Sequence, residues 1–318
     1  MKIVMMGSGG VGGHFGAKLA KGGADVHFIA RGAHLAAMRQ SGLRLEGHGE
    51  PVVLERVNAT DDPASIGMAD LVVIGVKLWD TADALARIQP MVGPATTLIS
   101  LQNGVTKSDM LRAAFPSSHV MDGVAYVATT IDRPGVIRRT GPLERLVFGE
   151  MAGGASKVGE ALLGFAKKGG INAELAGDVR VEVWQKFVFL IGLSATTTPM
   201  RSKIGPIRTN PLTRAFLLDV MREVVAVGTA LGVALPADYA EQRLAFADGV
   251  SPDMTSSMHH DLERGNKLEL PWLSGAVVEL GAQAGVPTPL NRAVRDILTL
   301  HAGGAGGVAA IVNSASGG

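Results

Sequence analysis

Short apolar runs alternate with amphipathic segments along the first half of the chain. The apolar runs contain few polar positions, which is typical of strands buried on both faces of a parallel sheet. Residues 13–21 and 81–88 show helical spacing of apolar positions between such runs. The pattern predicts a parallel sheet covered by helices on both faces. The predicted strands of this sheet are residues 2–6, 25–30, 71–76 and 97–102.

Three later apolar runs lie closer together in the sequence and surround turn residues such as Pro134-Gly135. Close spacing around turns favours antiparallel pairing, so we expect these runs to extend the same sheet. They are residues 120–128, 135–139 and 146–149, with residues 171–175 as a candidate last strand.

After about Asp178 the pattern becomes helical, and strand patterns all but vanish. We therefore predict two domains, an α/β domain over residues 1–178 and an all-helical domain over residues 179–318. Residues 301–318 are rich in Gly, Ala and Ser, which predicts a loose tail. The predicted helices of the second domain are residues 181–195, 211–231, 238–247, 256–264 and 271–284.

Composition supports two folded domains and argues against several classes of function. The chain has 318 residues, more than a single domain usually holds, and 47% of them are hydrophobic, which argues against disorder. The formal charge is +1 without a long basic run, which argues against nucleic acid or an anionic membrane as the partner.

Cysteine is absent from the sequence, which excludes disulfides, thiolate zinc sites and cysteine nucleophiles. A chain without cysteine fits a reducing cytoplasm, where we expect this protein to act. Residues 3–6 form too short an apolar run for a signal peptide, and residues 187–193 fall far short of the roughly 18 residues of a membrane span. We therefore expect a soluble protein.

A G-x-G-x-x-G pattern, Gly7-Ser8-Gly9-Gly10-Val11-Gly12, stands between the first predicted strand and a predicted helix. In this place the first glycine permits a tight turn, the second lets the backbone approach a pyrophosphate, and the third allows close packing of helix and strand. The helix N-terminus then stabilises the phosphate charge. The motif predicts a Rossmann-type dinucleotide-binding domain, and its position disfavours the alternative of a purely structural turn.

The residues at the ends of two predicted strands indicate which nicotinamide cofactor is bound. NAD-binding domains place an acidic residue at the end of the second strand, whereas NADP-binding domains place a cation near the 2′-phosphate. Here that strand ends at Arg31 with no carboxylate beside it, because Asp25 stands at its start. Lys77, just past residues 71–76, is a second phosphate candidate. We predict NADPH, with a solvated surface arginine as the alternative for Arg31.

The order and spacing of several motifs together give the chain a resemblance to the ketopantoate reductases (2-dehydropantoate 2-reductases) over nearly its whole length, the tail excluded. The resemblance implies a Rossmann domain, a helical domain, NADPH as cofactor and reduction of a 2-oxo acid to a 2-hydroxy acid. It is carried by Gly7-x-Gly9-x-x-Gly12, Arg31, Val76-Lys77, Gln102-Asn103-Gly104, Pro134-Gly135, Thr140-Gly141, Trp184-Gln185-Lys186-Phe187, Ser256-Ser257-Met258-x-x-Asp261, Glu269 and Gly285-Val286-Pro287-Thr288-Pro289-x-Asn291.

Lys186 is the candidate catalytic residue. Reduction of a ketone by hydride transfer develops negative charge on the carbonyl oxygen, so the site needs a cation or an acid nearby. Lys186 stands between Trp184 and Phe187 at the start of a very apolar helix, where burial lowers the pKa of an ammonium toward working pH. The sequence alone leaves a solvated lysine equally open, and the resemblance favours catalysis.

Three further residues are candidates for contacts to substrate and cofactor. Asn103 follows a predicted strand at the carboxyl edge of the sheet, where its side chain can bond the nicotinamide ribose or the substrate. The resemblance implies that Ser257 binds the substrate carboxylate and that Glu269 binds the substrate hydroxyl, the cofactor or the catalytic lysine. On the sequence alone Asn103-Gly104 is also a turn, Ser257 a helix cap and Glu269 a surface charge.

Two positions depart from the family pattern. Ketopantoate reductases usually carry asparagines four and eight residues after the catalytic lysine, on one face of the same helix. This chain has Leu190 and Ser194 there. The departure predicts a more apolar pocket, in which Ser194 still contacts the substrate, and it puts ketopantoate in question as the substrate.

Two rival functions remain on the sequence. A polyol-phosphate or opine dehydrogenase also uses a lysine, but the second domain lacks a basic cluster suited to a phosphorylated substrate. A regulator that binds NADPH without turnover is disfavoured by the presence of Lys186, Asn103, Ser257 and Glu269 together. The eight histidines have no metal-ligand spacing, so we expect no metal. A homodimer is compatible with the sequence, which does not decide the oligomeric state.

Overall fold

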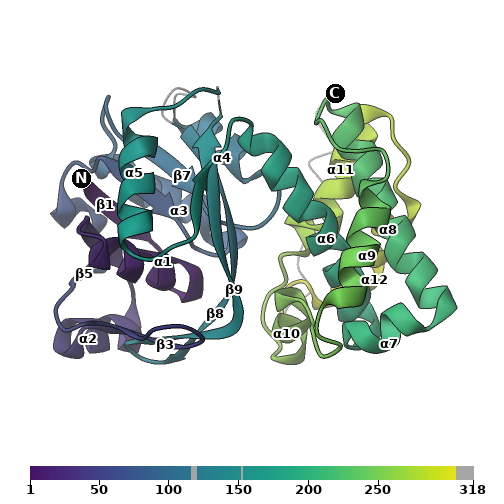
Figure 1. Cartoon of the computed structure of the whole chain (residues 1–318), viewed down its shortest axis with the longest axis horizontal. Coiled ribbons are helices and arrows are strands. Elements are labelled where there is room, and N and C mark those ends of the chain that lie inside the picture. Colours follow the sequence, from purple (N-terminus) through teal and green to yellow (C-terminus); the bar gives the residue numbers. More distant parts are fainter. Residues whose placement is uncertain (116–119, 152, 306–318) are drawn as a thin grey trace. The chain divides into compact units, whose positions relative to one another are not determined.

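The computed structural model describes residues 1–115, 120–151 and 153–305. These residues belong to two compact units, Met1–Val183 and Trp184–Gly318 (Figure 1). The division falls inside helix α6 (Val179–Met200), which begins directly after the predicted boundary at Asp178. The Asp178 carboxylate accepts the backbone N–H of Arg180 at 3.0 Å and so caps this helix. Most of the tail predicted over residues 301–318 lies outside the described residues.

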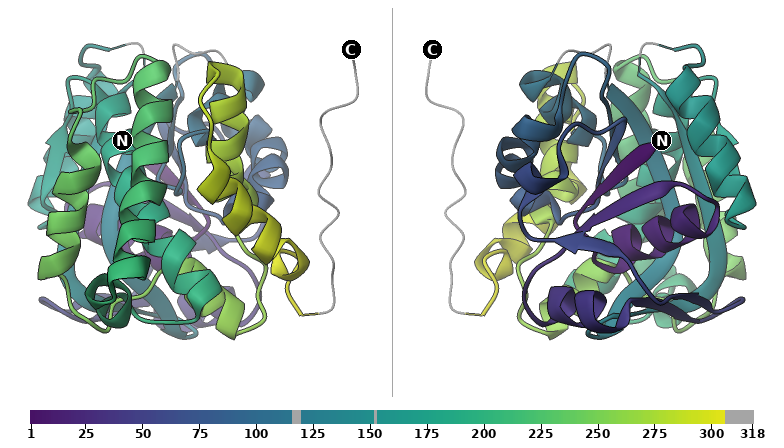
Figure 2. Two further views of the ribbon diagram at one scale, coloured as in Figure 1. Left: turned by 90° about the vertical axis from the view of Figure 1, so that its right-hand side faces the viewer. Right: turned by 90° about the vertical axis from the view of Figure 1, so that its left-hand side faces the viewer.

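Unit 1 is built on one mixed sheet, to which the described residues contribute ten strands in the order β4-β3-β9-β8-β7-β6-β1-β2-β5, with β10 beside β9. Strand β1 pairs in parallel with β2 on one side and β6 on the other, which the right-hand view of Figure 2 shows for the purple pair β1 and β2. The strand order therefore reverses at β1, which confirms the predicted Rossmann-type fold. The strands are β1 (Lys2–Met6), β2 (Asp25–Ile29), β3 (Leu43–Gly47), β4 (Val52–Leu54), β5 (Asn58–Thr60), β6 (Leu71–Ile74), β7 (Thr97–Ser100), β8 (Val120–Arg133), β9 (Val136–Glu150) and β10 (Ala173–Leu175).

Helices cover both faces of this sheet because the strands carry apolar side chains on both sides. One core combines alternate strand residues such as Ile3 and Met5 with α1, α2 and α5, and the opposite core combines Val4 and Met6 with α3 and α4. The helices of unit 1 are α1 (Gly10–Lys21), α2 (Gly32–Ser41), α3 (Thr81–Ile88), α4 (Lys107–Ala114) and α5 (Lys157–Lys168). Short 3₁₀ turns η1 (Pro63–Ile66), η2 (Leu78–Asp80) and η3 (Gln89–Met91) join these elements.

The predicted antiparallel extension of the sheet is confirmed for β8 and β9, but the prediction of two strands within residues 135–149 was wrong. One strand, β9, runs through the whole segment. Thr140-Gly141-Pro142, which stand between the two predicted strands, lie where the pairing shifts from Val127–Glu144 to Thr129–Arg139. The extra residues of β9 form an irregularity at this point without ending the ladder. Strand β8 also pairs in parallel with β7, which the turn spacing did not indicate.

Unit 2 is helical throughout its described residues, as predicted. Helix α8 contacts α7, α9, α11 and α12, which makes it the central helix of this unit. The predicted helix 271–284 is shorter, because the backbone of Leu273 leaves helical geometry and separates a 3₁₀ turn from α11. The elements after α6 are α7 (Ile204–Thr209), α8 (Pro211–Ala230), α9 (Tyr239–Gly249), α10 (Ser257–Glu263), η5 (Leu270–Trp272), α11 (Ser274–Ala284), α12 (Pro289–Leu298) and η6 (Thr299–His301).

Close packing of α6 on α8 fixes the first helix of unit 2. A Cβ added to Gly192 would lie 2.6 Å from Met221, and one added to Gly228 would lie 2.7 Å from the Trp184 ring. Glycine at both positions therefore lets the two helices approach each other. None of the helices in the described residues is long and apolar enough to cross a membrane.

Candidate active site

The first, third and sixth residues of the glycine-rich turn between β1 and α1 are the glycines of the G-x-G-x-x-G pattern, and their surroundings differ. Gly7 has φ +99°, and a Cβ there would lie 2.8 Å from the backbone nitrogen of Val76. A Cβ on Gly12 would clash with the carbonyl oxygen of Gly7. A Cβ on Gly9 would meet no atom within 4 Å. The fold therefore explains Gly7 and Gly12, whereas Gly9 leaves open space where a ligand can approach the backbone.

Helix α1 begins inside the motif, at Gly10, and its N-cap residue Gly9 has no side chain to satisfy the first backbone N–H groups. Its first turn holds no acidic side chain. Gly10 itself is required by the fold, because a Cβ there would lie 2.5 Å from the carbonyl oxygen of Thr129. An uncapped helix N-terminus with open space before it suits the phosphates of a dinucleotide. The residues of the turn thus fit the expected cofactor.

Ser8 and His34 hold the turn in place. The Ser8 hydroxyl donates to the Ile29 carbonyl oxygen at 3.0 Å and is buried. The Gly135 N–H donates to His34 Nδ1 at 3.1 Å, which leaves Nε2 to donate to the Ser8 carbonyl oxygen at 3.0 Å. Burial lowers the pKa of His34, and its bond to Ser8 opposes that shift. His34 belongs to no motif recognised in the sequence, and its place beside the turn is a result of the fold.

The loops after β6 and β7 are joined at the same edge of the sheet. The buried Gln102 side chain donates to the Val76 carbonyl oxygen at 2.9 Å and to Thr81 Oγ1 at 2.8 Å. Both strands end two residues earlier than predicted, so Val76 and Gln102 belong to loops. Lys77 and Asn103 follow these tied residues directly. Lys77 is exposed, with its Nζ 5.3 Å from the centroid of the Trp79 ring.

Arg31 follows β2 at this edge and is the N-cap residue of α2. Its side chain is 69% exposed, and its Nη2 lies 3.8 Å from Oδ2 of Asp80. The sequence placed no carboxylate beside Arg31, but the fold brings one from η2. An exposed pair at this distance is weak, so it leaves the guanidinium accessible to a stronger anion. The structure thus brings Arg31, Lys77 and Asn103 to the edge that carries the glycine-rich turn.

Lys186 lies on α6, half-buried, between two aromatic residues. Trp184 and Phe187 are buried and contact each other edge to face at 5.8 Å between ring centroids. Trp184 also packs on α8 at Gly228. This packing fixes the backbone from which Lys186 projects, so the ammonium is carried by a rigid element.

Ser194 is buried two turns further along α6. Its hydroxyl donates to the carbonyl oxygen of Leu190, one turn back in the same helix. The oxygen of Ser194 can therefore accept a hydrogen bond, but its proton is already used. Leu190, in turn, offers only an apolar side chain. These two positions have less hydrogen-bonding capacity than a pair of asparagines.

Ser257 and Glu269 lie on separate segments of unit 2. The cap of α10 is Ser256, whose hydroxyl accepts the His259 N–H at 3.0 Å, so the alternative of a capping Ser257 is wrong. Ser257 is exposed in the first turn. Glu269 is only 5% exposed, so the alternative of a surface charge is also wrong. Both results leave a ligand contact open for these residues.

A buried polar cluster connects α10 to α6. Ser256 forms hydroxyl bonds with Thr197 at 3.1 Å and Thr198 at 3.2 Å, and His259 Nδ1 donates to the Thr197 carbonyl oxygen at 2.8 Å. No motif or spacing in the sequence pointed to these threonines. They place Ser257 next to the end of α6, the helix that carries Lys186.

Asn291, the last residue of the motif that begins at Gly285, has a structural role in unit 2. Asn291 is fully buried, and its Nδ2 donates to Glu223 at 2.8 Å. The Glu223 carboxylate also accepts the backbone N–H groups of Leu290 at 2.8 Å and Asn291 at 2.9 Å. A side chain from α8 therefore caps α12, which ties the last helix to the centre of unit 2.

Comparison with known proteins places both units in one family. Residues 3–153 match the family described as ketopantoate reductase PanE/ApbA, and residues 178–302 match its C-terminal domain. The chain belongs to the ketopantoate reductase family. A 2-dehydropantoate 2-reductase of Mesorhizobium japonicum is 33% identical over 92% of this chain and 95% of its own length.

Solved structures of the family show the same fold over nearly the whole chain. A PanE/ApbA family ketopantoate reductase from Ralstonia eutropha JMP134 is 33% identical with a TM-score of 0.86, covering 95% of this chain and 98% of its own. A 2-dehydropantoate 2-reductase from Geobacter metallireducens is 26% identical with a TM-score of 0.88, covering 94% and 99%. The protein is therefore an oxidoreductase of this family.

Proposed function

We propose that this protein uses NADPH to reduce a 2-oxo acid to a 2-hydroxy acid, with ketopantoate as the substrate and pantoate as the product. The observation that carries the proposal is the match of both units to one family, together with a relative named 2-dehydropantoate 2-reductase at 33% identity. The roles of individual residues are supported by the sequence motifs and by the positions of these residues within each unit.

The proposal assigns cofactor binding to unit 1. Backbone N–H groups of the turn Gly7–Gly12 and the N-terminus of α1 bind the pyrophosphate, which approaches through the open space at Gly9. Arg31 binds the 2′-phosphate and replaces its weak contact to Asp80. Lys77 supplies a second positive charge, and Asn103 bonds the nicotinamide ribose or the substrate. When bound, the reduced nicotinamide supplies a hydride to the carbonyl carbon.

The proposal assigns proton donation to Lys186 of unit 2. As the carbonyl carbon gains a hydride, its oxygen gains negative charge and takes a proton from the Lys186 ammonium, which becomes a neutral amine and is later reprotonated by solvent. Ser257 donates a hydrogen bond to the substrate carboxylate. Glu269 accepts from the product hydroxyl or from Lys186 and orients the group that it contacts. The balance is one hydride and one proton added to one C=O bond.

A second candidate substrate is a 2-oxo acid with an apolar tail. The observation that favours it is the bond from Ser194 to Leu190, because this face of α6 then has no free hydroxyl donor at either position. Ketopantoate carries a hydroxyl group that needs a partner when it leaves water, and an unpaired polar group costs roughly 1–3 kcal/mol. A plain branched 2-oxo acid avoids that cost.

One absorbance assay tests the reaction and ranks the two substrates. NADPH oxidation is followed with ketopantoate and with a branched 2-oxo acid, using the unaltered protein and the variant Lys203→Ala. Lys203 is an exposed lysine of the unit that carries Lys186, so this variant is the matched control for removal of Lys186. We expect turnover with both proteins. Binding of NADPH without oxidation by any 2-oxo acid would support a regulator in place of an enzyme.

A further inference from the structure

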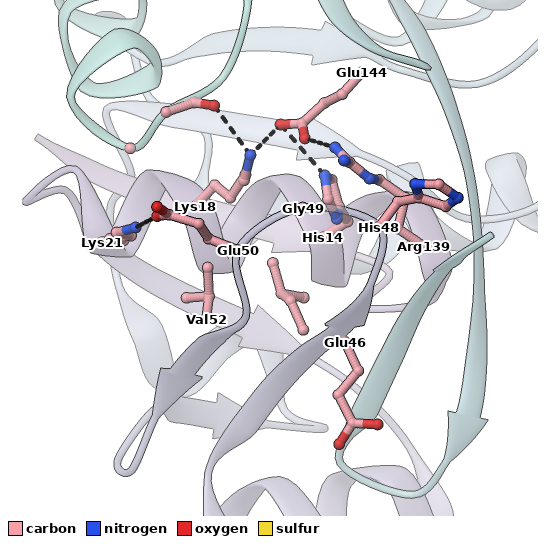
Figure 3. Close-up of a pocket in the computed structure, with 13 residues that line it drawn as sticks. His14, Lys18, Lys21, Glu46, His48, Gly49, Glu50, Val52, Arg139 and Glu144 are labelled. Atoms are coloured by element: carbon pink, nitrogen blue, oxygen red, sulfur yellow. Dashed lines mark hydrogen bonds and ion pairs between the residues drawn. The ribbon is translucent and has the colours of Figure 1, made fainter. Parts of the chain in front are cut away.

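A cavity of about 300 Å³ lies within unit 1, away from the proposed cofactor residues (Figure 3). Helix α1 contributes His14, Lys18 and Lys21 to its lining, β9 contributes Arg139 and Glu144, and the segment after β3 covers it. None of the residues of the glycine-rich turn, nor Arg31, Lys77 or Asn103, lines this cavity. Its size falls at the lower end of the range for small-molecule sites.

The buried part of the cavity holds more positive than negative groups. Glu144, 8% exposed, forms ion pairs with Lys18 and Arg139, whose side chains are 13% and 12% exposed. Burial opposes the charge of Glu144, but contacts to His14 and Lys18 outweigh it and lower its pKa to about 2. One carboxylate therefore faces two permanent cations. The sum of these buried charges is positive and suits an anion.

The other two carboxylates of the lining do not balance this excess. Glu46 lies 2.9 Å from Arg133 and 3.3 Å from Arg138 and so is already paired with cations outside the lining. Figure 3 shows it pointing away from the labelled cluster around Glu144. Glu50 is 91% exposed, where it lies 3.7 Å from Lys21 at the mouth of the cavity.

Two side chains of the lining carry buried nitrogen atoms without a hydrogen-bond partner among the described residues. His14 is 3% exposed, and neither Nδ1 nor Nε2 makes a hydrogen bond, although Nε2 lies 3.6 Å from Glu144. Arg139 Nε is the third such nitrogen. His14 Nε2 faces Glu144, so the nitrogens that still lack an acceptor in the lining are His14 Nδ1 and the Nε–H of Arg139. A buried donor left unpaired is costly and calls for an acceptor.

We propose that this cavity binds a small oxyanion, a phosphate or carboxylate group that accepts hydrogen bonds from His14 and Arg139. The positive buried charge favours an anion, and the two donors require acceptor oxygens. Lys21, 45% exposed at the mouth, adds a cation on the path of entry. The site is independent of the proposed reaction, because its residues take no part in it.

The test compares inorganic phosphate with malonate, each against chloride at equal ionic strength and with NADPH saturating, so that the cofactor site is filled. Calorimetry measures the dissociation constant, and the ring resonances of His14, assigned by their absence in His14→Leu, report where the anion binds. We expect one of the two anions to bind and to shift the His14 resonances. Whichever anion binds more tightly identifies the phosphate or the carboxylate as the natural group.

Variants separate this site from general charge effects. His14→Leu removes the donor and keeps a buried side chain of similar size, and we expect affinity to fall about tenfold or more. Lys21→Ala, at an exposed position, should weaken binding by a smaller factor. Lys157→Ala removes an exposed lysine of the same unit that does not line the cavity and should leave affinity unchanged. Equal binding by the unaltered protein and His14→Leu, or no shift of the His14 resonances, overturns the proposal.

Discussion

The glycine-rich turn of unit 1 and helix α6 of unit 2 carry the two halves of the proposed reaction in different ways. In the turn, backbone groups do the binding, and the surroundings of each glycine indicate its role. Gly7 and Gly12 have no room for a side chain, whereas a Cβ on Gly9 would meet no protein atom within 4 Å. On α6, one side chain does the chemistry, and residues 187–193 directly after it carry no polar side chain. Nothing in the backbone of α6 distinguishes Lys186 from another half-buried lysine.

The two types of site should therefore respond differently to substitution. A backbone site depends on the absence of side chains, so small additions damage it. A side-chain site depends on one functional group, so its removal stops the reaction while binding elsewhere persists. Variants at both sites test this contrast.

Removal of Lys186 should have the largest effect. Lys186→Ala takes away the proposed proton donor, and positioned general acids contribute about a hundredfold to ten-thousandfold in rate. We expect kcat to fall by that order and the NADPH dissociation constant to stay nearly unchanged. Steady-state kinetics and NADPH titration measure the two quantities. A variant with more than about half of its activity would show that another group supplies the proton.

Two glycine substitutions should separate folding from ligand approach. Gly12→Ala places a Cβ against the Gly7 carbonyl oxygen, and overpacking of this kind typically lowers the free energy of unfolding by about 1–3 kcal/mol. Both stability and NADPH binding should therefore fall. Gly9→Ala meets open space at φ −71° and should fold normally, while NADPH affinity drops by roughly tenfold or more as the added methyl displaces the pyrophosphate. Denaturant unfolding and NADPH titration check the pair. If Gly9→Ala binds NADPH as tightly as the unaltered protein, the phosphates lie elsewhere.

Glu144→Gln tests a charge of unit 1 that the proposed reaction does not use. The folded-state pKa of Glu144 is lowered from 4.5 to about 2, so its stabilisation is complete above about pH 4.5 and is lost as the pH falls toward 2. We expect the variant to lose roughly 2–3 kcal/mol of unfolding free energy at pH 7 and less than about 0.5 kcal/mol near pH 2, where half of the Glu144 carboxyls are protonated. Denaturant unfolding across this pH range measures the difference. An equal loss at both ends of the range would contradict the ionic account.

Cofactor preference should depend on Arg31. A charge-assisted bond to the 2′-phosphate contributes roughly 1.5–3 kcal/mol, so the unaltered protein should prefer NADPH over NADH by about tenfold to a hundredfold. Arg31→Asp should erase or invert this preference. Asp80→Asn removes the competing carboxylate and should raise NADPH affinity by at most about fivefold, because exposed pairs are weak. The ratio of kcat/KM for NADPH and NADH measures this preference. Equal use of both cofactors by the unaltered protein would show that Arg31 does not bind the 2′-phosphate.

The smallest expected effect concerns substrate choice on α6. The double variant Leu190→Asn with Ser194→Asn adds hydrogen-bonding groups worth roughly 1–3 kcal/mol to a substrate hydroxyl, so the preference should shift toward ketopantoate. The measurement is the ratio of kcat/KM for ketopantoate and a plain branched 2-oxo acid, before and after the change. A strong preference for ketopantoate in the unaltered protein would show that the departures from the family pattern do not matter.

Local patterns in the sequence determined the elements and the cofactor motif. A short apolar run predicted β1 and helical spacing of apolar residues predicted α3, both at their observed bounds, and the glycine spacing predicted the turn. These signals could be read because they depend only on neighbours in the chain. The family followed from the order of motifs, since the positions of Lys186, Ser257 and Glu269 carry no local signal of their function.

Contacts between side chains that are far apart in the chain became known only from the tertiary structure. Asp80 reaches Arg31, His34 joins Ser8 to Gly135, and Glu144 gathers the cations of α1 and β9. Helix packing also buries Glu269, and the Ser194 hydroxyl donates a hydrogen bond to the Leu190 carbonyl oxygen. These facts depend on the pairing order of the strands and on the packing of helices far apart in the chain. Hydrophobic periodicity fixes which face of an element is buried, but it does not specify which polar side chain from another element lies against that face.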